Sequence, residues 1–168
     1  MDKSQIRALV FDQYGKNINF VLDGGRSKIG LESTVINLCG NIKIMRPGAI
    51  SKKEIGKTLR KNISISKKVN KLNSPGLLKK HYSPGIPIRL NCKKADNKAA
   101  FIVFGKKYKK GKYIFNLSPK GNLKEAGKNL YKILRKVKNL NFKKINVVKI
   151  PNRDIGIAIN DRLRKAAY

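Results

Sequence analysis

The chain has 168 residues, of which 40 are Lys or Arg and 9 are Asp or Glu, so its formal net charge is +31. This length allows one domain of ordinary size or two small ones. Because acids are so scarce, sites built from carboxylates, such as two-metal centres and paired-acid hydrolases, are disfavoured. Hydrophobic residues make up 40% of the sequence, so a folded core is compatible with the charge. We expect any charged partner to be an anion.

No apolar run approaches the roughly 20 residues that a membrane-spanning helix needs. The N-terminus has no signal-peptide core either, because Asp12 interrupts the apolar run from Ala8 to Phe11. We therefore expect a cytoplasmic protein without a membrane partner. Cys39 and Cys92 lie far apart, with no Cys or His at metal-ligand spacing. They predict reduced, buried thiols and no protein-bound metal or prosthetic group.

The positive charge has two interpretations. Lys, Ile and Asn are abundant along the whole chain, as in a protein coded by an AT-rich genome. A basic protein that binds RNA would have a similar charge. However, the sequence lacks zinc-finger spacing, a glycine-aromatic RNA-recognition signature and a basic helix that continues into heptads. A basic, non-catalytic RNA-binding accessory protein is therefore the alternative function.

The first part of the chain predicts short strands and one helix. Strands are expected at Ile18–Leu22, Ser33–Cys39 and Ile42–Met45, where apolar residues are bounded by turn residues. Ser51 and Glu54 match a capping box, in which each side chain satisfies a free backbone N–H, so a helix should cover residues 51–60. A unit of this size has a thin core and buries only about 60% of its unfolded surface, so it looks like part of something larger.

The remaining residues predict a linker and a second domain. The stretch Ser74–Pro87 carries three Pro and two Gly, which favours an extended, semi-rigid linker within residues 61–87. In residues 88–168 strands alternate with helices, which is typical of a small α/β domain with a mostly parallel sheet. The expected elements are strands at Ile88–Leu90, Ala99–Phe104 and Ile145–Ile150, a helix capped by Asn122 with Glu125 at the capping-box position, and a last helix over Ile157–Ala167.

Several residues could bind a ligand, although each also has an ordinary structural explanation. Ser33 opens a strand, where a hydroxyl can bind a carboxylate or phosphate but more often bonds locally. Arg46 precedes a forced turn, where its guanidinium could bind phosphate or simply be solvated. His81 and Tyr82 lie in the linker, where a lone His is usually exposed. Residues 160–164 are interpreted as a helix face with local ion pairs.

The order of the motifs is more specific than any one of them. They are Asp23-Gly24-Gly25, Gly30-Leu31-Glu32-Ser33-Thr34-Val35, Arg46-Pro47-Gly48-Ala49-Ile50, Ser74-Pro75-Gly76 with His81-Tyr82-Ser83-Pro84, and Ala158-Ile159-Asn160-Asp161-Arg162-Leu163. In this order they closely resemble the two-domain form of the threonylcarbamoyl-AMP synthase family over nearly the whole chain. The resemblance implies that residues 1–60 are the C-terminal part of a YrdC-like catalytic α/β domain, residues 61–87 the interdomain linker, and residues 88–168 an accessory Rossmann-like α/β domain.

The resemblance also implies an activity. Family members combine L-threonine, bicarbonate and ATP into threonylcarbamoyl-adenylate and release pyrophosphate, a nucleotidyl transfer that serves the tRNA modification N6-threonylcarbamoyladenosine. By the same resemblance, Ser33 would bind L-threonine and Arg46 the ATP phosphates, while His81 and Tyr82 would fold over the bound nucleotide. Mg²⁺ would enter with the ATP. Contact with tRNA is compatible with this role but not required by it.

One departure from the family pattern affects the expected activity. Family members carry a Lys-x-Arg motif and a Ser-x-Asn motif for ATP upstream of the matching region. This chain reaches Asp23-Gly24-Gly25 without either motif. We therefore expect this chain alone not to make the adenylate. It is either one part of a split enzyme that needs a separately encoded N-terminal half, or a truncated remnant.

Overall fold

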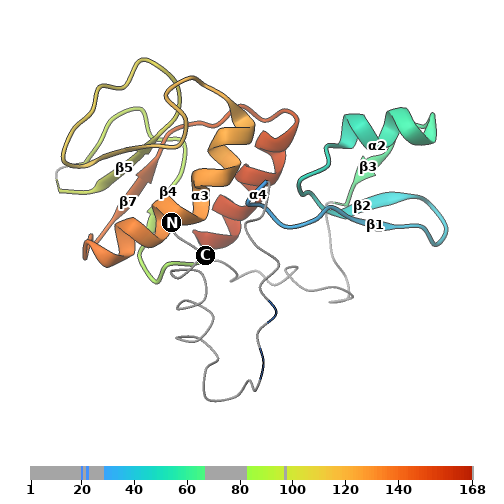
Figure 1. Ribbon diagram of the computed structural model, residues 1–168, viewed down its shortest axis with the longest axis horizontal. Coiled ribbons are helices and arrows are strands. Elements are labelled where there is room, and N and C mark those ends of the chain that lie inside the picture. Colours follow the sequence, from blue (N-terminus) through green and yellow to red (C-terminus); the bar gives the residue numbers. More distant parts are fainter. Residues whose placement is uncertain (1–19, 21, 23–28, 67–82, 97, 168) are drawn as a thin grey trace.

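The computed structural model describes residues 20, 22, 29–66, 83–96 and 98–167. Residues 29–66 contain a small unit with one sheet and one helix (Figure 1). Its elements are β1 (Val35–Asn37), β2 (Lys43–Arg46), α2 (Lys52–Leu59) and β3 (Ser64–Ile65). The strand order is β1-β2-β3, with β1 antiparallel and β3 parallel to β2. The parallel connection from β2 to β3 runs through α2, which packs Ile55 against the sheet.

Residues 83–167 contain the second, larger unit. Its elements are β4 (Ile88–Arg89), β5 (Ala100–Val103), β6 (Ile114–Asn116), α3 (Leu123–Asn139), β7 (Ile145–Val147) and α4 (Ile155–Ala166). The strands form one sheet in the order β4-β7-β5-β6, and all of its pairings are parallel. All residues of the central strands β5 and β7 are buried, as expected for a parallel sheet. The predicted α/β class with a mostly parallel sheet is confirmed.

The two units have very unequal cores. In the small unit only Ile44, Ile55 and Ile63 are buried together. The larger unit buries a continuous apolar cluster drawn from β5, β6, β7, α3 and α4. Apolar burial is the main source of folding free energy, so the large unit supplies most of it. Within residues 29–66 the core is thin, while most of residues 1–28, which the same expectation included, lie outside the described residues.

The helices begin much as the sequence predicts. Ser51 Oγ accepts the backbone N–H of Glu54 at 3.2 Å, and the Glu54 carboxylate accepts the backbone N–H of Ser51 at 2.7 Å, which completes the capping box. At α3, Asn122 caps the first turn as predicted, but Glu125 does not bond back to it. The Glu125 carboxylate instead accepts the hydroxyl of buried Ser118 at 2.5 Å, and that hydroxyl accepts the backbone N–H of Asn122 at 2.9 Å.

Other differences concern short elements and the cysteines. Four of the predicted strands are one to four residues shorter, the strand predicted at Ile42–Met45 is shifted by one residue, and the two- and three-residue strands β3 and β6 were not predicted. β3 lies at residues 64–65, within the stretch interpreted as linker, while the boundaries of the domains stay a prediction. Most of the strand predicted at Ile18–Leu22 lies outside the described residues. Both cysteines are free, but Cys39 is exposed and Cys92 half-buried, so the prediction of buried thiols is wrong.

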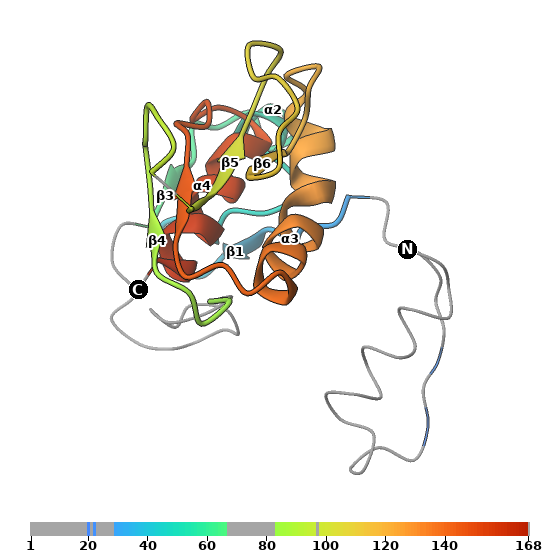
Figure 2. The ribbon, with the colours of Figure 1, turned by 90° about the vertical axis from the view of Figure 1, so that its left-hand side faces the viewer.

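The segment 29–32 joins the two units. Leu31, only 8% exposed, packs into the core of the large unit instead of the small one. Gly30 has a φ of +71°, and a Cβ there would lie 2.9 Å from the Cα of Lys128 on α3, so only glycine fits. In Figures 1 and 2 this segment runs from the small sheet to the helices of the large unit. α4 lies between the two sheets and is therefore placed to contact both units (Figure 1).

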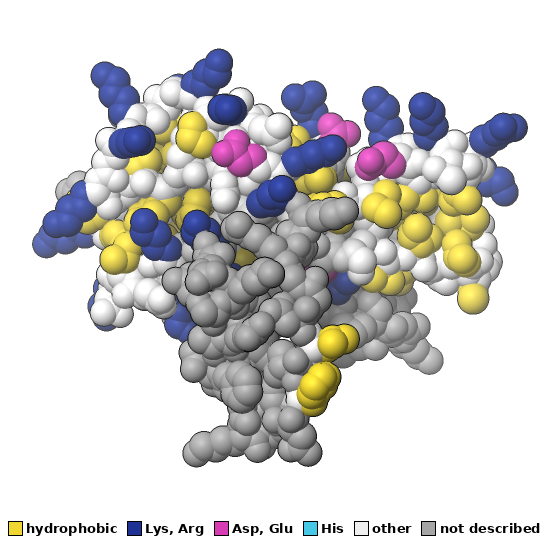
Figure 3. Space-filling view, viewed as in Figure 1, with side chains coloured by type: hydrophobic (Ala, Val, Ile, Leu, Met, Phe, Trp, Pro, Cys, Tyr) yellow, Lys and Arg dark blue, Asp and Glu magenta, His cyan; other side chains and the backbone are white. Residues whose placement is uncertain are grey.

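The surface matches the composition. Lys and Arg side chains are spread over the visible face of both units instead of forming one patch (Figure 3). Among the described residues, no helix is both long and apolar enough to cross a bilayer.

The burial of Leu31 leads to a first prediction. Leu31→Ala should lower the free energy of unfolding by about 2–4 kcal/mol, because it leaves a cavity in the large core. The matched control is Leu38→Ala at a side chain that is 69% exposed, which should cost less than about 0.5 kcal/mol. Urea unfolding followed by circular dichroism measures both. Equal losses in the two variants would show that segment 29–32 is not part of the large core.

Candidate functional site

Ser33 and Arg46 meet at the edge of the small sheet. Arg46 ends β2 and Ser33 lies two residues before β1, and the antiparallel pairing of Val35 with Arg46 brings them together. Arg46 Nη2 donates to the Ser33 carbonyl oxygen at 3.2 Å and lies 3.4 Å from Ser33 Oγ. Arg46 is only 8% exposed, so the interpretation of a solvated loop arginine is wrong. Ser33 itself is exposed and accessible to a ligand.

The backbone around this pair is tightly packed. The turn after Arg46 lies directly on the strand start, because a Cβ on Gly48 would come within 2.3 Å of Ser33 C and Thr34 N. The Ala49 N–H donates to the Glu32 carbonyl at 3.1 Å. Thr34 Oγ1 donates to the Ile50 carbonyl at 2.6 Å and accepts the Ile50 N–H at 3.2 Å. Residues 32–34 and 47–50 therefore form one connected loop pair.

A buried arginine from the large unit holds this loop pair. Arg162 on α4 has a side chain that is 0% exposed. Its Nε donates to the Glu32 carboxylate at 2.7 Å and its Nη2 to the Pro47 carbonyl at 3.0 Å. Nη1 donates to Asp161, and Tyr131 Oη on α3 donates to Glu32 at 2.8 Å. We call these groups, Arg162 with Glu32, Tyr131, Asp161 and the Pro47 carbonyl, the Arg162 network.

The charges in this network are matched. Burial raises the pKa of the Glu32 carboxyl, but the hydrogen bond and positive charge of Arg162, with the Tyr131 hydroxyl, more than offset it, so the pKa lies below 4.5. Burial lowers the pKa of Arg162, but the hydrogen bond and charge of Glu32, with the charge of Asp161, outweigh this effect, so the pKa is raised above its ordinary value. Both groups are therefore ionised at neutral pH.

Sequence reasoning missed the long-range role of Arg162. The local pairs predicted for residues 160–164 exist, since Asp161 bonds both Arg162 and Lys165. However, Arg162 also reaches Glu32, 130 residues away in the chain. One signal could have revealed it. Arg162 stands three residues after Ile159 and seven after Ile155, on the apolar stripe of α4, and a charge on such a stripe implies a buried partner.

The other two predicted site residues, His81 and Tyr82, lie outside the described residues. Their proposed closure over a nucleotide stays a prediction. Within the described part of the chain, no group of three His, Cys, Asp or Glu side chains could hold a metal ion.

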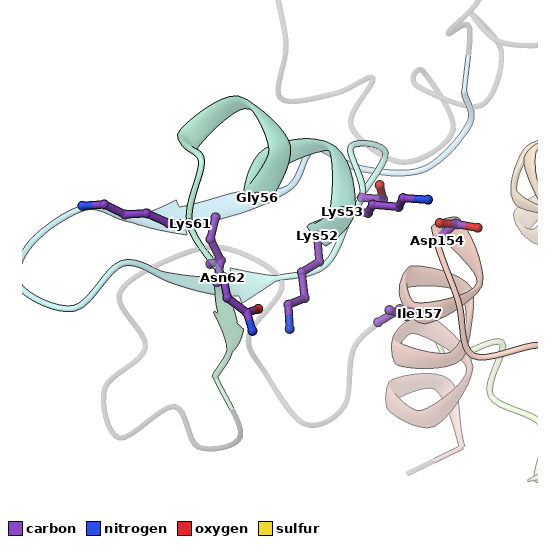
Figure 4. A pocket seen from close by; sticks show the side chains of 9 residues that line it. Lys52, Lys53, Gly56, Lys61, Asn62, Asp154 and Ile157 are labelled. Carbon is purple, nitrogen blue, oxygen red and sulfur yellow. The ribbon is translucent and has the colours of Figure 1, made fainter.

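Two open clefts lie between the units, and the larger one borders Ala49 and Ile50 of the loop pair. The smaller, about 270 Å³, separates α2 from the start of α4 and is lined by Lys52, Lys53 and Ile157 among others (Figure 4). In Figure 4, Lys53 extends toward Asp154 while Lys61 points away from the cleft. The larger, about 730 Å³, adds the start of α3. Neither cleft is lined by Ser33 or Arg46.

The lining of the larger cleft does not mark it as a binding site. Lys and Arg make up 4 of its 14 lining residues, close to the 40 in 168 of the whole chain. The fraction of Lys and Arg in the lining is therefore close to the chain average. The acidic residues Glu54 and Asp154 line this cleft as well. The candidate functional site is Ser33 of the loop pair together with Arg46, which ends β2 directly before residues 47–50.

The lowered pKa of Glu32 predicts a pH dependence of stability. A carboxyl whose pKa is depressed on folding stabilises the protein above its ordinary pKa of 4.5, and this contribution is lost as the pH falls through the folded value. Glu32→Gln should cost about 1–3 kcal/mol at pH 6, because it weakens the charged hydrogen bonds of Arg162. Acidification from pH 6 to pH 3 should then lower the unfolding midpoint less in Glu32→Gln than in the wild type. All other carboxylates are shared, so equal drops would contradict the assignment.

Comparisons with known proteins identify the family of this chain. Residues 50–168 match the family described as "Threonylcarbamoyl-AMP synthase, C-terminal domain". The chain is 31% identical to a threonylcarbamoyl-AMP synthase of Pyrococcus abyssi over 93% of its length, and 26% identical to one of Bacillus subtilis over 88%. These alignments cover 51% and 48% of the two relatives, so the chain spans about half their length.

A solved structure shares the fold. The crystal structure of Pyrococcus abyssi Sua5 complexed with L-threonine aligns with a TM-score of 0.77 and 25% identity, over 94% of this chain and 52% of that one. The expected fold class and family resemblance are thereby confirmed. The chain belongs to the threonylcarbamoyl-AMP synthase family and corresponds to a C-terminal portion of its members.

Proposed function

We propose that this chain forms the C-terminal portion of a threonylcarbamoyl-AMP synthase, in which Ser33 binds L-threonine and Arg46 binds the phosphates of ATP. Family membership supports the reaction class. The observation that carries the proposal for the site is the contact between Arg46 and Ser33, 13 residues apart in the chain. A solved relative in complex with L-threonine supports the choice of amino acid.

The chemistry suits the residues of the loop pair. In the proposed reaction, the threonine amine adds to bicarbonate, loses water and becomes a carbamate. A carbamate oxygen then attacks the α-phosphorus of ATP, and pyrophosphate leaves. Such a reaction depends on positioning and on neutralising phosphate charge, for which a partly buried arginine with a planar fork of donors is suited. Mg²⁺ would enter with the ATP as part of the substrate.

We further propose that these residues need the N-terminal half of the catalytic domain for activity. The small unit buries only three residues in its own core, so its sheet depends on neighbouring structure. In this proposal a separate polypeptide supplies the N-terminal half, and the product of the adjacent upstream reading frame is the first candidate for it. In this arrangement the adenylate serves formation of N6-threonylcarbamoyladenosine in tRNA.

Reconstitution tests the proposed function. The chain is assayed alone and with the candidate N-terminal half for pyrophosphate release from ATP that depends on both L-threonine and bicarbonate. We expect activity only when both polypeptides are present. Activity of the chain alone would contradict the need for a second half, and inactivity of every pairing would contradict the proposed function.

Variants of the reconstituted enzyme test the proposed role of Arg46. Arg46→Lys should lower kcat/KM for ATP by about 100-fold, because an ammonium cannot reproduce the bonds of the guanidinium fork. The matched control is Arg135→Lys at an exposed position of α3, which should leave kcat/KM unchanged. If Arg46→Lys retained wild-type kinetics, Arg46 would not bind the phosphates.

A further inference from the structure

We propose that Arg162 is a positioning residue of the active site, through which the accessory α/β unit sets the geometry of Ser33 and Arg46. The proposal rests on the proposed function of that pair. It assigns the large unit a part in substrate binding, although the residues expected to touch substrate belong to the small one.

The contacts of Arg162 fall on both halves of the loop pair. Its Nε holds the Glu32 carboxylate, one residue before Ser33, and its Nη2 holds the Pro47 carbonyl, one residue after Arg46. One rigid guanidinium therefore fixes the two residues that flank the site. Because the fork is planar, the separation of Glu32 and Pro47 is fixed together with their orientation.

The surroundings prevent Arg162 from adopting another arrangement. Its side chain is fully buried, so moving the guanidinium would leave a buried charge without its partners. Tyr131 on α3 holds Glu32 from a second helix, at 2.8 Å and 3.0 Å from the two carboxylate oxygens. Two packed helices of the large core thus hold the loop pair in place, while Ser33 stays exposed.

Hydrogen exchange and kinetics together test this role. Arg162→Lys keeps the charge but cannot hold Glu32 and Pro47 at once, and Arg164→Lys, at an exposed position on the same helix, is the matched control. In the isolated chain, the amides of Ala49 and Ile50, which bond to Glu32 and Thr34, report the loop pair. We expect their exchange to quicken by about 10-fold or more in Arg162→Lys and to stay unchanged in Arg164→Lys.

In the reconstituted enzyme, kcat/KM for L-threonine should fall by about 100-fold in Arg162→Lys, mainly through KM, at a temperature at which the variant is fully folded. A residue with a structural role alone would lower the unfolding midpoint without changing KM in the folded protein. Wild-type exchange and KM in folded Arg162→Lys would therefore overturn the proposal.

Two further outcomes are decisive. If Arg162→Lys does not fold, Glu32→Gln replaces it, since this variant weakens the same bonds while keeping the side-chain shape; unchanged amide exchange and KM would then overturn the proposal. If the wild-type chain with its N-terminal half is inactive, the proposed function fails. The amide exchange of Ala49 and Ile50 alone then decides whether Arg162 orders the loop pair.

Discussion

A buried positive charge dictates how the two units of this protein are joined. Arg162 has no exposed side-chain surface, so its charge must be matched within the protein. The chain has only nine acidic residues, yet two of them, Glu32 and Asp161, bond to this one arginine. Replacing a buried ion pair with apolar residues is often neutral for stability. The Arg162 network is therefore better explained by the arrangement that it specifies than by the free energy that it contributes.

The candidate site lies at the boundary between the core of the small unit and the core of the large unit. Three buried isoleucines cannot hold the small sheet rigid, whereas Leu31 anchors its first residues in the large core. Gly30 and Gly48 allow the backbone to approach α3 and the strand start closely enough for the contacts to form. The position of the loop pair next to Arg46 thus depends on α3 and α4, through the contacts of Tyr131 and Arg162.

Local patterns in the sequence predicted the parts that depend on local physics. The capping box at Ser51, the apolar face of α3 and the buried run of β5 follow from contacts within a few residues or from simple periodicity. The resemblance to a family assigned separate ligands to Ser33 and Arg46, but it did not predict their direct contact. Short strands such as β3 have too few residues to show alternation, and the contact of Arg162 with Glu32 spans 130 residues. No local pattern encodes such a contact, although the position of Arg162 on an apolar helix face indicates that some partner exists.

The separation of Glu32 and Arg162 along the chain also constrains the order of events during synthesis. During synthesis the ribosome releases Glu32 well before Arg162, because Arg162 lies 130 residues later in the chain, on α4. The loop pair therefore cannot take its final form until α4 has emerged. Contacts between such distant residues also slow folding, because a long loop has to close first. A product that terminates before α4 would lack the Arg162 network and the order that this network gives to the loop pair.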